Sequence, residues 1–497
     1  MTLTRRKPLA VLLDQASHSD LKRTLTATSL VALGIGAVIG AGIFVRTAAA
    51  ATEAAGPAVT VSFIIAALGC AFAGLCYAEF AAMIPIAGSA YTYAYTTMGE
   101  FVAWIIGWAL VLEYALGAAT LSISWAEYLN KLLNWFGMSI PYQWCHSPME
   151  TSMTTPGLHG IINIPAVIIL LLLSLVLIKG TQESATLNAI IVAVKVSIVI
   201  AFVAVGWHFI NPANHIPFTI PANTPGHEGF FKHGWGGVVG GAGIVFFAFI
   251  GFDAVSTAAQ EAKNPARDMP IGIMGSLAIC TLLYITFGYV ITGVANWREF
   301  AVAGKEASVA YAVQHHMPGF EWLALTITIA ILAGFSSVML VMLLGQSRVF
   351  YSMSKDGLLP RLFSDVHPRF RTPYKSNVLL FFFVGAFGAF LPESVAGDLT
   401  SIGTLFAFML VSIGVWIMRH REPHVHRPFR TPLVPVVPIL AVIICGGMII
   451  SLDHRTQLAA LSWMIIGLFI YFLYSRKHSL LNQPPQAVRA TDTAPVA

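Results

Sequence analysis

Long stretches of the chain carry no charged side chain, and they limit the folds open to it more than any other feature. Each stretch has 20 or more residues, about the length of helix that crosses a bilayer. Only 10% of all residues are charged, whereas soluble domains carry about 25%. Asp, Glu, Lys and Arg are absent from residues 24–45, 54–78, 151–178, 269–297, 322–347, 399–418, 431–452 and 456–475. This pattern indicates a polytopic membrane protein.

Apolar segments that contain one charge bring the number of expected membrane spans to twelve. The first span is not expected to be a cleaved signal peptide, because it lacks a small-residue cleavage site and the apolar pattern continues beyond it. We therefore predict an all-α polytopic membrane protein with twelve transmembrane helices. The expected spans are 27–47, 57–83, 100–128, 160–179, 187–210, 237–260, 270–295, 321–347, 376–392, 400–418, 432–451 and 456–475.

The basic residues predict which side of the membrane each loop faces, since Lys and Arg accumulate in cytoplasmic loops. With the N-terminus inside, the cytoplasmic segments carry 21 of the 28 Lys and Arg, and the external loops carry 6, with Arg46 counted among them. Both termini are therefore expected to be cytoplasmic, in the plasma (inner) membrane. Contact with anionic lipid of the bilayer accounts for the net charge of +5, so we expect no nucleic-acid partner, and the sequence identifies no protein partner.

The segment Gly34–Phe44 reads GIGAVIGAGIF and places four glycines in the first span. Three interpretations compete. A dinucleotide-binding loop needs G-x-G-x-x-G between a strand and a helix, and neither the spacing nor the membrane setting fits. Gly36-x-x-x-Gly40 matches the close-packing motif of membrane helices. The third interpretation is a break in the helix near Gly40, with Gly34 and Gly36 serving close packing.

A second glycine-rich segment, VVGGAGIVFFAFIGFDA at Val238–Ala254, lies five spans later. Five is odd, so the two segments cross the membrane in opposite directions. An inverted pair of interrupted helices is typical of a secondary transporter with a binding site at the membrane midplane, although glycine is common in membrane helices and chance similarity is the alternative. The predicted divisions are 1–24, a cytoplasmic arm; 25–210, a first repeat; 211–418, a second repeat; 419–478, two appended helices; and 479–497, a disordered cytoplasmic tail.

Unwound backbone within a membrane is tolerated only where it is buried in protein or lines water. At Gly40-Ala41-Gly42 the freed N–H groups and the positive end of the following half-helix suit an α-carboxylate. The segment from Phe247 to Gly251 offers carbonyls to an α-ammonium group. Backbone groups recognise what all amino acids share, so these segments do not identify the substrate's side chain.

Lys195 lies near the middle of span 5, in IIVAVKVSIVI. An ionisable side chain at this depth costs at least ~2.5–3.5 kcal/mol and indicates function. A desolvated lysine loses its proton readily, so Lys195 is predicted to carry the coupling proton. The alternatives are a permanent ion pair with a buried carboxylate, or snorkelling to the interface, which its central position disfavours.

Three further polar residues lie within expected spans. Glu113, in WALVLEYALGAA, is a candidate for lining the substrate pocket, for pairing with Lys195 or for joining a buried polar network. Asp253 follows the second break and is expected either to cap the following half-helix or to support the break. Ser337, next to Ser336 in span 8, is a candidate pocket residue, although membrane serines often bond only their own helix.

Several motifs together resemble the amino acid–polyamine–organocation superfamily, and within it the cationic amino acid transporter branch and its bacterial relatives. The resemblance covers about residues 20–475. The motifs are GAVIGAGIF, PIAGSAYTYAYTTMGE, FFAFIGFDAVSTAAQEAKNPARDMPIGI and QSRVFYSMSKDGLLP. It implies ten core helices in two inverted five-helix repeats, two appended helices, and alternating access around broken helices 1 and 6.

The resemblance also implies roles for individual residues. The substrate carboxylate would meet Val38, Gly40, Ala41 and Gly42, and the ammonium group would meet the carbonyls of Phe247, Ala248 and Ile250. Lys195 matches a lysine that some bacterial relatives, similar to proton-coupled importers, carry where sodium-coupled relatives bind an ion. Glu113 resembles an acidic residue beside the substrate pocket, and Ser337 would leave room there for a long side chain.

We therefore predict a proton-coupled importer of L-amino acids that uses no cofactor besides the coupling proton. A proton-independent exchanger of cationic amino acids is the main alternative, and the choice between neutral and cationic substrates stays open. A membrane-embedded enzyme would need a convergent nucleophile or metal constellation, and the sequence offers neither. Saturable uptake with counterflow would argue against a channel.

Overall fold

The computed structural model describes residues 5–8, 23–40, 42–84, 89–152, 155, 157–180, 185–303, 308–370 and 372–482. This part of the chain is helical and contains isolated β-bridges but no strand. Within it, eight helical segments are long and apolar enough to cross a membrane, and four shorter apolar helices accompany them. The prediction of an all-α polytopic membrane protein is confirmed.

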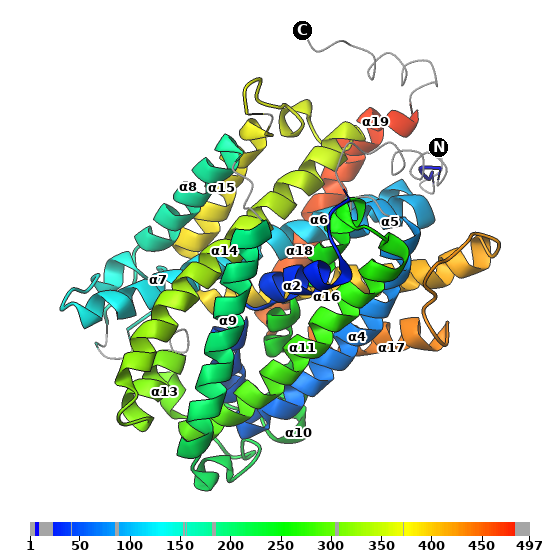
Figure 1. The fold of residues 1–497 in the computed structure, drawn as a ribbon. Helices are drawn as coiled ribbons and strands as arrows, with labels where there is room; N and C mark the ends of the chain where they lie inside the picture. The colour runs from blue at the N-terminus through cyan, green and yellow to red at the C-terminus, as the bar shows by residue number, and fades with distance from the viewer. Residues whose placement is uncertain are drawn as a thin grey trace.

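The first half of the chain forms helices that follow the expected spans (Figure 1). Turns of 3₁₀- or π-helix, labelled η, continue or connect the α-helices. The elements are α2 (Ala27–Val38), η1 (Gly42–Arg46), α3 (Thr47–Ala50), η2 (Ala51–Ala55), η3 (Gly56–Ala58), α4 (Val59–Met83), α5 (Ser89–Thr97), α6 (Glu100–Val111), η4 (Leu112–Leu116), α7 (Gly117–Trp135), η5 (Tyr142–Trp144), α8 (Ile164–Lys179) and α9 (Ala185–Gly206).

The second half begins with short turns and continues with long helices. Its elements are η6 (Trp207–Phe209), η7 (Pro212–His215), η8 (Phe230–Lys232), α10 (Gly234–Val245), η9 (Phe246–Phe249), η10 (Asp253–Glu261), α11 (Pro265–Val294), α12 (Glu299–Ala303), α13 (Ser308–His316), α14 (Glu321–Lys355), η12 (Arg361–Phe363), α15 (Tyr374–Phe390), α16 (Glu393–Arg421), α17 (Val436–Ser451), α18 (His454–Ile470), η13 (Tyr471–Ser475), α19 (Arg476–His478) and η14 (Leu480–Asn482).

Several helices extend past the boundaries expected from charge, among them the following three. The first helical stretch continues through η2 to Ala55 instead of ending near residue 47, α14 reaches Lys355, and α16 begins at Glu393 instead of near residue 400. The first and third extensions share one cause. Arg46 pairs with both Glu393 and Asp398 inside the protein, so these charges do not have to lie in water.

Small residues bring α2 and α11 close together, and α11 also packs along α4. A Cβ at Gly34 would lie 2.5 Å from Oγ of Ser276, and a Cβ at Gly272 would lie 2.7 Å from Cβ of Leu30. Membrane helices approach this closely only where side chains are small. The close-packing interpretation of Gly34 is confirmed.

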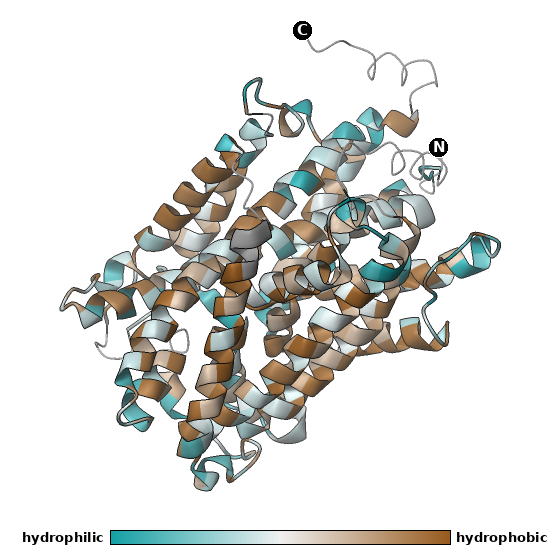
Figure 2. Cartoon of the chain, viewed as in Figure 1, coloured by the Kyte–Doolittle hydropathy of each residue, from teal (hydrophilic) through white to brown (hydrophobic). Residues whose placement is uncertain are grey.

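Hydrophobic residues are spread over most of the helices (Figure 2), and many of them are exposed. Leu282 on α11, Phe382 on α15 and Leu473 on η13 are large, apolar and exposed. Hydrophilic residues gather at the ends of the helices and in the loops. This distribution is typical of a protein surrounded by lipid, where exposed apolar surface has no cost.

Both expected helix breaks are present. α2 ends at Val38, Ile39 and Gly40 form a bend, and helical structure resumes at Gly42; the expected contact residue Ala41 lies outside the described residues. α10 gives way at Phe246 to a single 3₁₀ turn, after which Ile250 has extended backbone. Gly251 then has a φ of 110°, a conformation that side chains with a Cβ rarely adopt.

Candidate functional site

The two helix breaks touch each other through their backbones. A Cβ at Gly42 would lie 2.1 Å from Cα of Ala248, a separation that no real pair of carbon atoms adopts. Glycine is therefore required where η1 crosses η9. The segments predicted to bind the carboxylate and the ammonium ends of one substrate are in direct contact here.

One hydroxyl group joins the two breaks to a third helix. Oη of Tyr284, on α11, lies 3.0 Å from the carbonyl oxygen of Val38 and 2.8 Å from that of Ala248. A tyrosine hydroxyl has a single proton to donate, so the two carbonyls share it. Tyr284 was missed by the sequence analysis, although a tyrosine inside the charge-free run 269–297 is a polar group that needs a partner.

The remaining expected contact residues gather around the same point. Gly40 faces α7 and α14, since a Cβ there would lie 3.6 Å from Leu121 and 3.5 Å from Val338. Ser337 is buried next to Val338, and Phe247 and Ile250 are buried beside Ala248. The structure thus brings Val38, Gly40, Gly42, Phe247, Ala248 and Ile250 to the region of the breaks, and Ser337 directly precedes Val338, which lies beside Gly40.

Lys195 reaches the first break from α9. Its Nζ donates a hydrogen bond of 3.1 Å to the carbonyl of Gly36, and its side chain is 4% exposed. The carbonyls in the last turn of a helix lack N–H partners within that helix, so the break at Val38 leaves the Gly36 carbonyl available. A cation at this end of α2 also interacts favourably with the helix dipole.

A cavity of about 10 Å³ separates Lys195 from the bend, which is room for about one water molecule. Its walls are apolar apart from the lysine and include Phe44 on η1 and Phe335 on α14. Gly334 makes room for the lysine, because a Cβ there would lie 2.9 Å from Cε of Lys195. The side chain of Lys195 is therefore buried within the protein.

Glu113 and Asp253 form a second buried site with Tyr114. Glu113 lies in η4, and both of its carboxylate oxygens are without a hydrogen-bond partner among the described residues. The charge that acts on it is that of Asp253, whose Oδ2 accepts a hydrogen bond of 3.2 Å from Tyr114. Two carboxylates that interact in a buried site repel, and one shared proton removes the repulsion. The arrangement favours the polar-network interpretation of Glu113 over an ion pair with Lys195.

Arg46 occupies the far side of the breaks from Lys195 and was counted by the sequence analysis as an external loop charge. It is instead 1% exposed, at the end of η1. Its guanidinium pairs with Asp398 and lies 3.3 Å from Oε2 of Glu393. Its Nε donates to the carbonyl of Ile244, and its Cζ lies 6.0 Å from the ring centre of Phe247.

The Arg46 ion pairs lie beside a cavity. Asp398 also lines this cavity of about 170 Å³, together with Glu53 and Lys232. Ser394 and Val395 at the start of α16 line the same cavity, as does Ile244, whose carbonyl accepts the bond from Arg46.

The chain matches a protein family along nearly all of its length. Residues 25–475 fit the family described as amino acid permease. The chain belongs to this family. Members of the family and the relatives described below are transporters and not enzymes.

Three curated relatives illustrate the range of substrates. This permease is 43% identical over 480 residues to the branched-chain amino acid permease BcaP of Bacillus subtilis (strain 168), which covers 96% of this chain and 99% of that protein. It is 40% identical over 482 residues to the methylthioribose transporter of the same organism, covering 97% and 100%. It is 33% identical over 426 residues to cationic amino acid transporter 4, vacuolar, of Arabidopsis thaliana, covering 85% and 68%. The resemblance to a superfamily transporter related to the cationic branch is confirmed.

Proposed function

We propose that this permease imports L-amino acids together with a proton by alternating access. In this proposal twelve spans form two inverted five-helix repeats, 25–210 and 211–418, with residues 419–478 as appended helices. The protein lies in the plasma (inner) membrane with both termini in the cytoplasm. The observation that carries the proposal is the hydrogen bond from Lys195 to the Gly36 carbonyl, one turn before the first break.

The proposed coupling acts through the end of α2. A charged Lys195 holds the Gly36 carbonyl by a charge-assisted hydrogen bond and by attraction to the helix dipole. When the lysine loses its proton, the attraction to the dipole disappears and the bond weakens. α2 is then free to move relative to α9, which changes the side of the membrane that the break faces.

The proposed binding of substrate uses the two breaks. The carboxylate of the substrate accepts hydrogen bonds from the N–H groups of Gly40 and Gly42. Its ammonium group donates hydrogen bonds to the carbonyls of Phe247, Ala248 and Ile250. For this to happen the contact between Gly42 and Ala248 has to open, so the structure corresponds to a closed state. Tyr284 is then released from one carbonyl while it keeps the other.

We further propose that the substrate is a neutral aliphatic amino acid. The side chains of Leu121 and Val338 beside Gly40 support this, as does the name of the relative that transports branched-chain amino acids. Glu113 shares its buried site with the carboxyl group of Asp253, and a proton shared between the two would weaken the attraction of Glu113 to a cationic side chain. The methylthioribose transporter has a similar identity to this chain. Because its name gives a different kind of substrate, the substrate of this chain has to be identified by a direct screen.

Uptake into proteoliposomes tests the proposal. With an imposed inward proton gradient, the wild-type protein should accumulate leucine or a related amino acid. Lys195→Met should lose nearly all of the gradient-driven accumulation but keep counterflow of the same substrate. Ser336→Ala is the matched control, because Ser336 bonds only to Leu332 of its own helix. Unchanged proton-driven accumulation by Lys195→Met would refute the coupling role.

The same vesicles distinguish the alternative, a proton-independent exchanger of cationic amino acids. The buried carboxylate of Glu113 is the observation that favours it. Exchange of arginine or lysine without a pH gradient, reduced in Glu113→Gln, would support that alternative. Absence of arginine counterflow together with proton-driven leucine uptake would remove it.

A further inference from the structure

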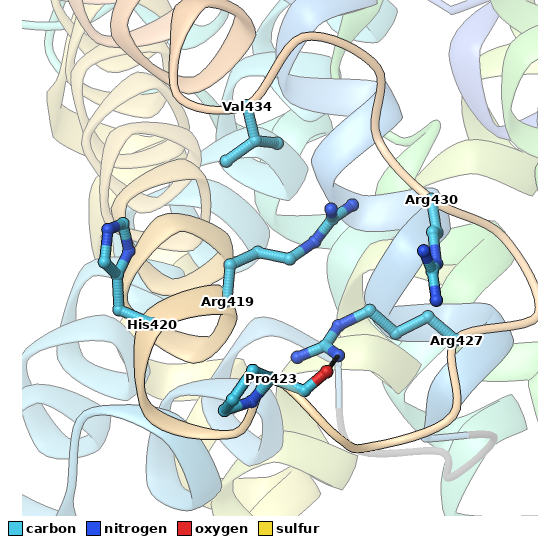
Figure 3. Close-up of a pocket in the computed structure, with 6 residues that line it drawn as sticks. All are labelled: Arg419, His420, Pro423, Arg427, Arg430 and Val434. Carbon is cyan, nitrogen blue, oxygen red and sulfur yellow. Dashed lines mark hydrogen bonds between the residues drawn. The ribbon is translucent and has the colours of Figure 1, made fainter.

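A basic pocket lies far from the helix breaks, at the end of α16 and in the loop that leads to α17. The cavity has a volume of about 300 Å³, within the usual range of ligand pockets. Figure 3 shows the loop curving around it, with three arginine side chains extending toward the same space. Its lining residues are Arg419, His420, Pro423, Arg427, Arg430 and Val434.

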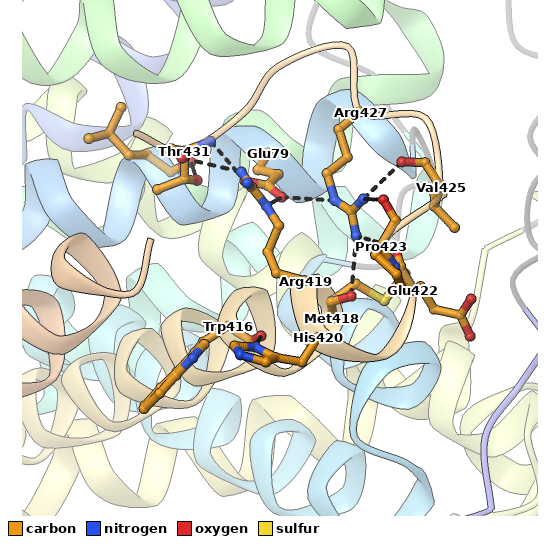
Figure 4. Close-up of polar contacts among 11 residues, drawn as sticks. Glu79, Trp416, Met418, Arg419, His420, Glu422, Pro423, Val425, Arg427 and Thr431 are labelled. Atoms are coloured by element: carbon orange, nitrogen blue, oxygen red, sulfur yellow. Dashed lines mark hydrogen bonds and ion pairs between the residues drawn. The ribbon is translucent and has the colours of Figure 1, made fainter. Parts of the chain in front are cut away.

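One buried carboxylate organises two of the arginines. Arg419 donates from Nε and Nη2 to Glu79 of α4 at 2.9 and 2.8 Å, and Nε of Arg427 lies 3.3 Å from Oε1 of the same residue. Figure 4 shows Glu79 between the two guanidinium groups. The backbone N–H of Thr431 also donates to Glu79 at 2.8 Å. The loop is therefore held firmly in place.

Arg427 is used within the fold. Its terminal nitrogens donate to the carbonyls of Val425 at 2.8 Å, Met418 at 3.2 Å and Glu422 at 2.7 Å. These carbonyls belong to the end of α16 or to the loop, and arginine commonly satisfies such groups. Arg427 thus shapes one wall of the pocket.

Arg430 is not used in this way. It is exposed, and it makes no ion pair with any residue in the described part of the chain. Arg419 likewise leaves its Nη1 without a hydrogen bond to the described residues. Three arginines face one carboxylate, an excess of two positive charges. Burial, together with the charges of Arg419 and Arg430, lowers the pKa of Arg427 although the charge of Glu79 acts to raise it. Glu79 balances one of these positive charges, and an anion in the pocket would balance another.

The surroundings of the pocket point to a lipid. Leu433 and Val436, on either side of the pocket residue Val434, are exposed apolar side chains at the start of α17. Trp416, one turn before His420 on α16, is also exposed, and tryptophan prefers the level of the lipid headgroups. Charged groups and apolar groups lie side by side, as they do in a phospholipid.

We propose that this pocket binds the phosphate group of an anionic phospholipid, with its acyl chains along Leu433 and Val436. Arg430 and Arg419 contact the phosphate, since arginine matches its geometry. Basic pockets between membrane helices bind lipid headgroups by the same chemistry. The pocket lies at the end of the molecule that holds residues 5–8, because Arg421 bonds to Thr97 of α5, and Tyr95 of α5 accepts a bond from Lys7.

Native mass spectrometry of the delipidated full chain tests the assignment. Phosphatidylglycerol should bind more tightly than phosphatidylcholine, and Arg430→Gln should weaken phosphatidylglycerol binding about fivefold, the effect of one surface arginine on anionic lipid. Arg421→Gln is the matched control. It removes the same charge at the last residue of α16, next to the loop, but Arg421 does not line the pocket. Thermal unfolding of each variant without lipid checks that the fold is intact.

Three results would overturn the proposal or part of it. Equal weakening by Arg430→Gln and Arg421→Gln would show attraction by general surface charge. Equal binding of phosphatidylglycerol and phosphatidylcholine would show that the pocket does not select lipids with a net negative headgroup. Competition by glycerol phosphate as strong as that by phosphatidylglycerol would keep the phosphate site but replace the lipid by a soluble anion.

Discussion

The two ends of α16 carry arginine–carboxylate clusters of opposite balance. At its start, Glu393 and Asp398 face Arg46; we call these three residues the Arg46 cluster. At its end, Arg419 lies with Arg427 and Arg430 around Glu79, and these four residues are the Arg419 cluster. Asp398 and Arg419 are separated by about 32 Å along the helix, close to the thickness of a bilayer core of ~30 Å.

The difference in balance follows the polarity of the helix. Carboxylates are favourable at a helix N-terminus and arginines at its C-terminus, and α16 has acidic residues at one end and basic residues at the other. The Arg46 cluster has one arginine for two carboxylates, an excess of one negative charge, and its guanidinium is buried between them. The Arg419 cluster has an excess of arginine and opens to a cavity. An added anion would therefore balance charge in the second cluster, whereas it would add to the negative charge of the first.

Removing the arginine of the buried cluster should have the largest effect. Arg46→Ala removes the buried cation that Glu393 and Asp398 face, and losing one member of a buried pair costs about 3–5 kcal/mol. We expect a much lower unfolding temperature in detergent and little transport. The measurement is thermal unfolding followed by uptake in proteoliposomes.

A triple variant separates stability from transport. Arg46→Met with Glu393→Gln and Asp398→Leu removes all the charges, and such replacements are often close to neutral in stability. We expect it to regain much of the unfolding temperature lost by Arg46→Ala, but not normal transport. If Arg46→Ala unfolds like the wild type, the cluster does not hold the fold at this end.

Removing the only carboxylate of the Arg419 cluster should have a smaller effect. Glu79→Gln loses charge-assisted bonds to Arg419, each of which contributes roughly 1.5–3 kcal/mol, but Arg419 is partly exposed and regains water. We expect a loss of about 2 kcal/mol in the free energy of unfolding. Phosphatidylglycerol should restore more stability to this variant than it adds to the wild type, because it replaces the missing negative charge.

Glu422→Gln is the control for that comparison. Glu422 is an exposed acid of the same loop, and its side chain lies outside the cluster, so little change is expected. If lipid stabilises Glu79→Gln and the wild type equally, the arginines do not respond to an added anion and the contrast with the Arg46 cluster weakens.

The helices and both breaks could be predicted because their signals are local in sequence. Charge-free runs mark the spans, and the glycines around Gly40 and Gly251 mark the interruptions. Lys195 is conspicuous for the same reason, since a single charge in an apolar run requires an explanation. Its contact with Gly36 became visible only in the folded chain, and its part in coupling stays a prediction, as does the role of each expected contact residue.

Both clusters and Tyr284 could not be predicted, because their partners are distant in sequence. Arg46 is 347 residues from Glu393, and Arg419 is 340 residues from Glu79. Arg46 follows an apolar run directly, so its position alone resembles that of a loop charge. Tyr284 bonds to Val38 across 246 residues. Polar partners at such separations are determined by helix packing and leave no periodic pattern.

The smallest effect is expected from the ion pair between His146 and Glu127, whose charge changes with pH. This pair lies at the end of the molecule that holds the Arg46 cluster. His146 lies in the loop after α7, which bonds through Asn163 to Ala389 just before α16, and its Nε2 lies 2.6 Å from Oε1 of Glu127. Burial alone lowers the pKa of His146, but hydrogen bonds with Cys145 and Glu127 and the charge of Glu127 raise it to about 11.

A raised pKa means that the charged histidine stabilises the fold. This contribution is fully present below the unfolded value of about 6.5 and is lost as the pH rises through about 11. His146→Gln should therefore lower stability by roughly 1 kcal/mol at pH 6, and the difference from the wild type should shrink toward pH 10. Arginine keeps its proton over this range, so the deficit of Arg46→Ala should persist there. The control is His208→Gln, which changes an exposed histidine. If the loss of stability in His146→Gln stays constant up to pH 10, His146 acts by packing and not by charge.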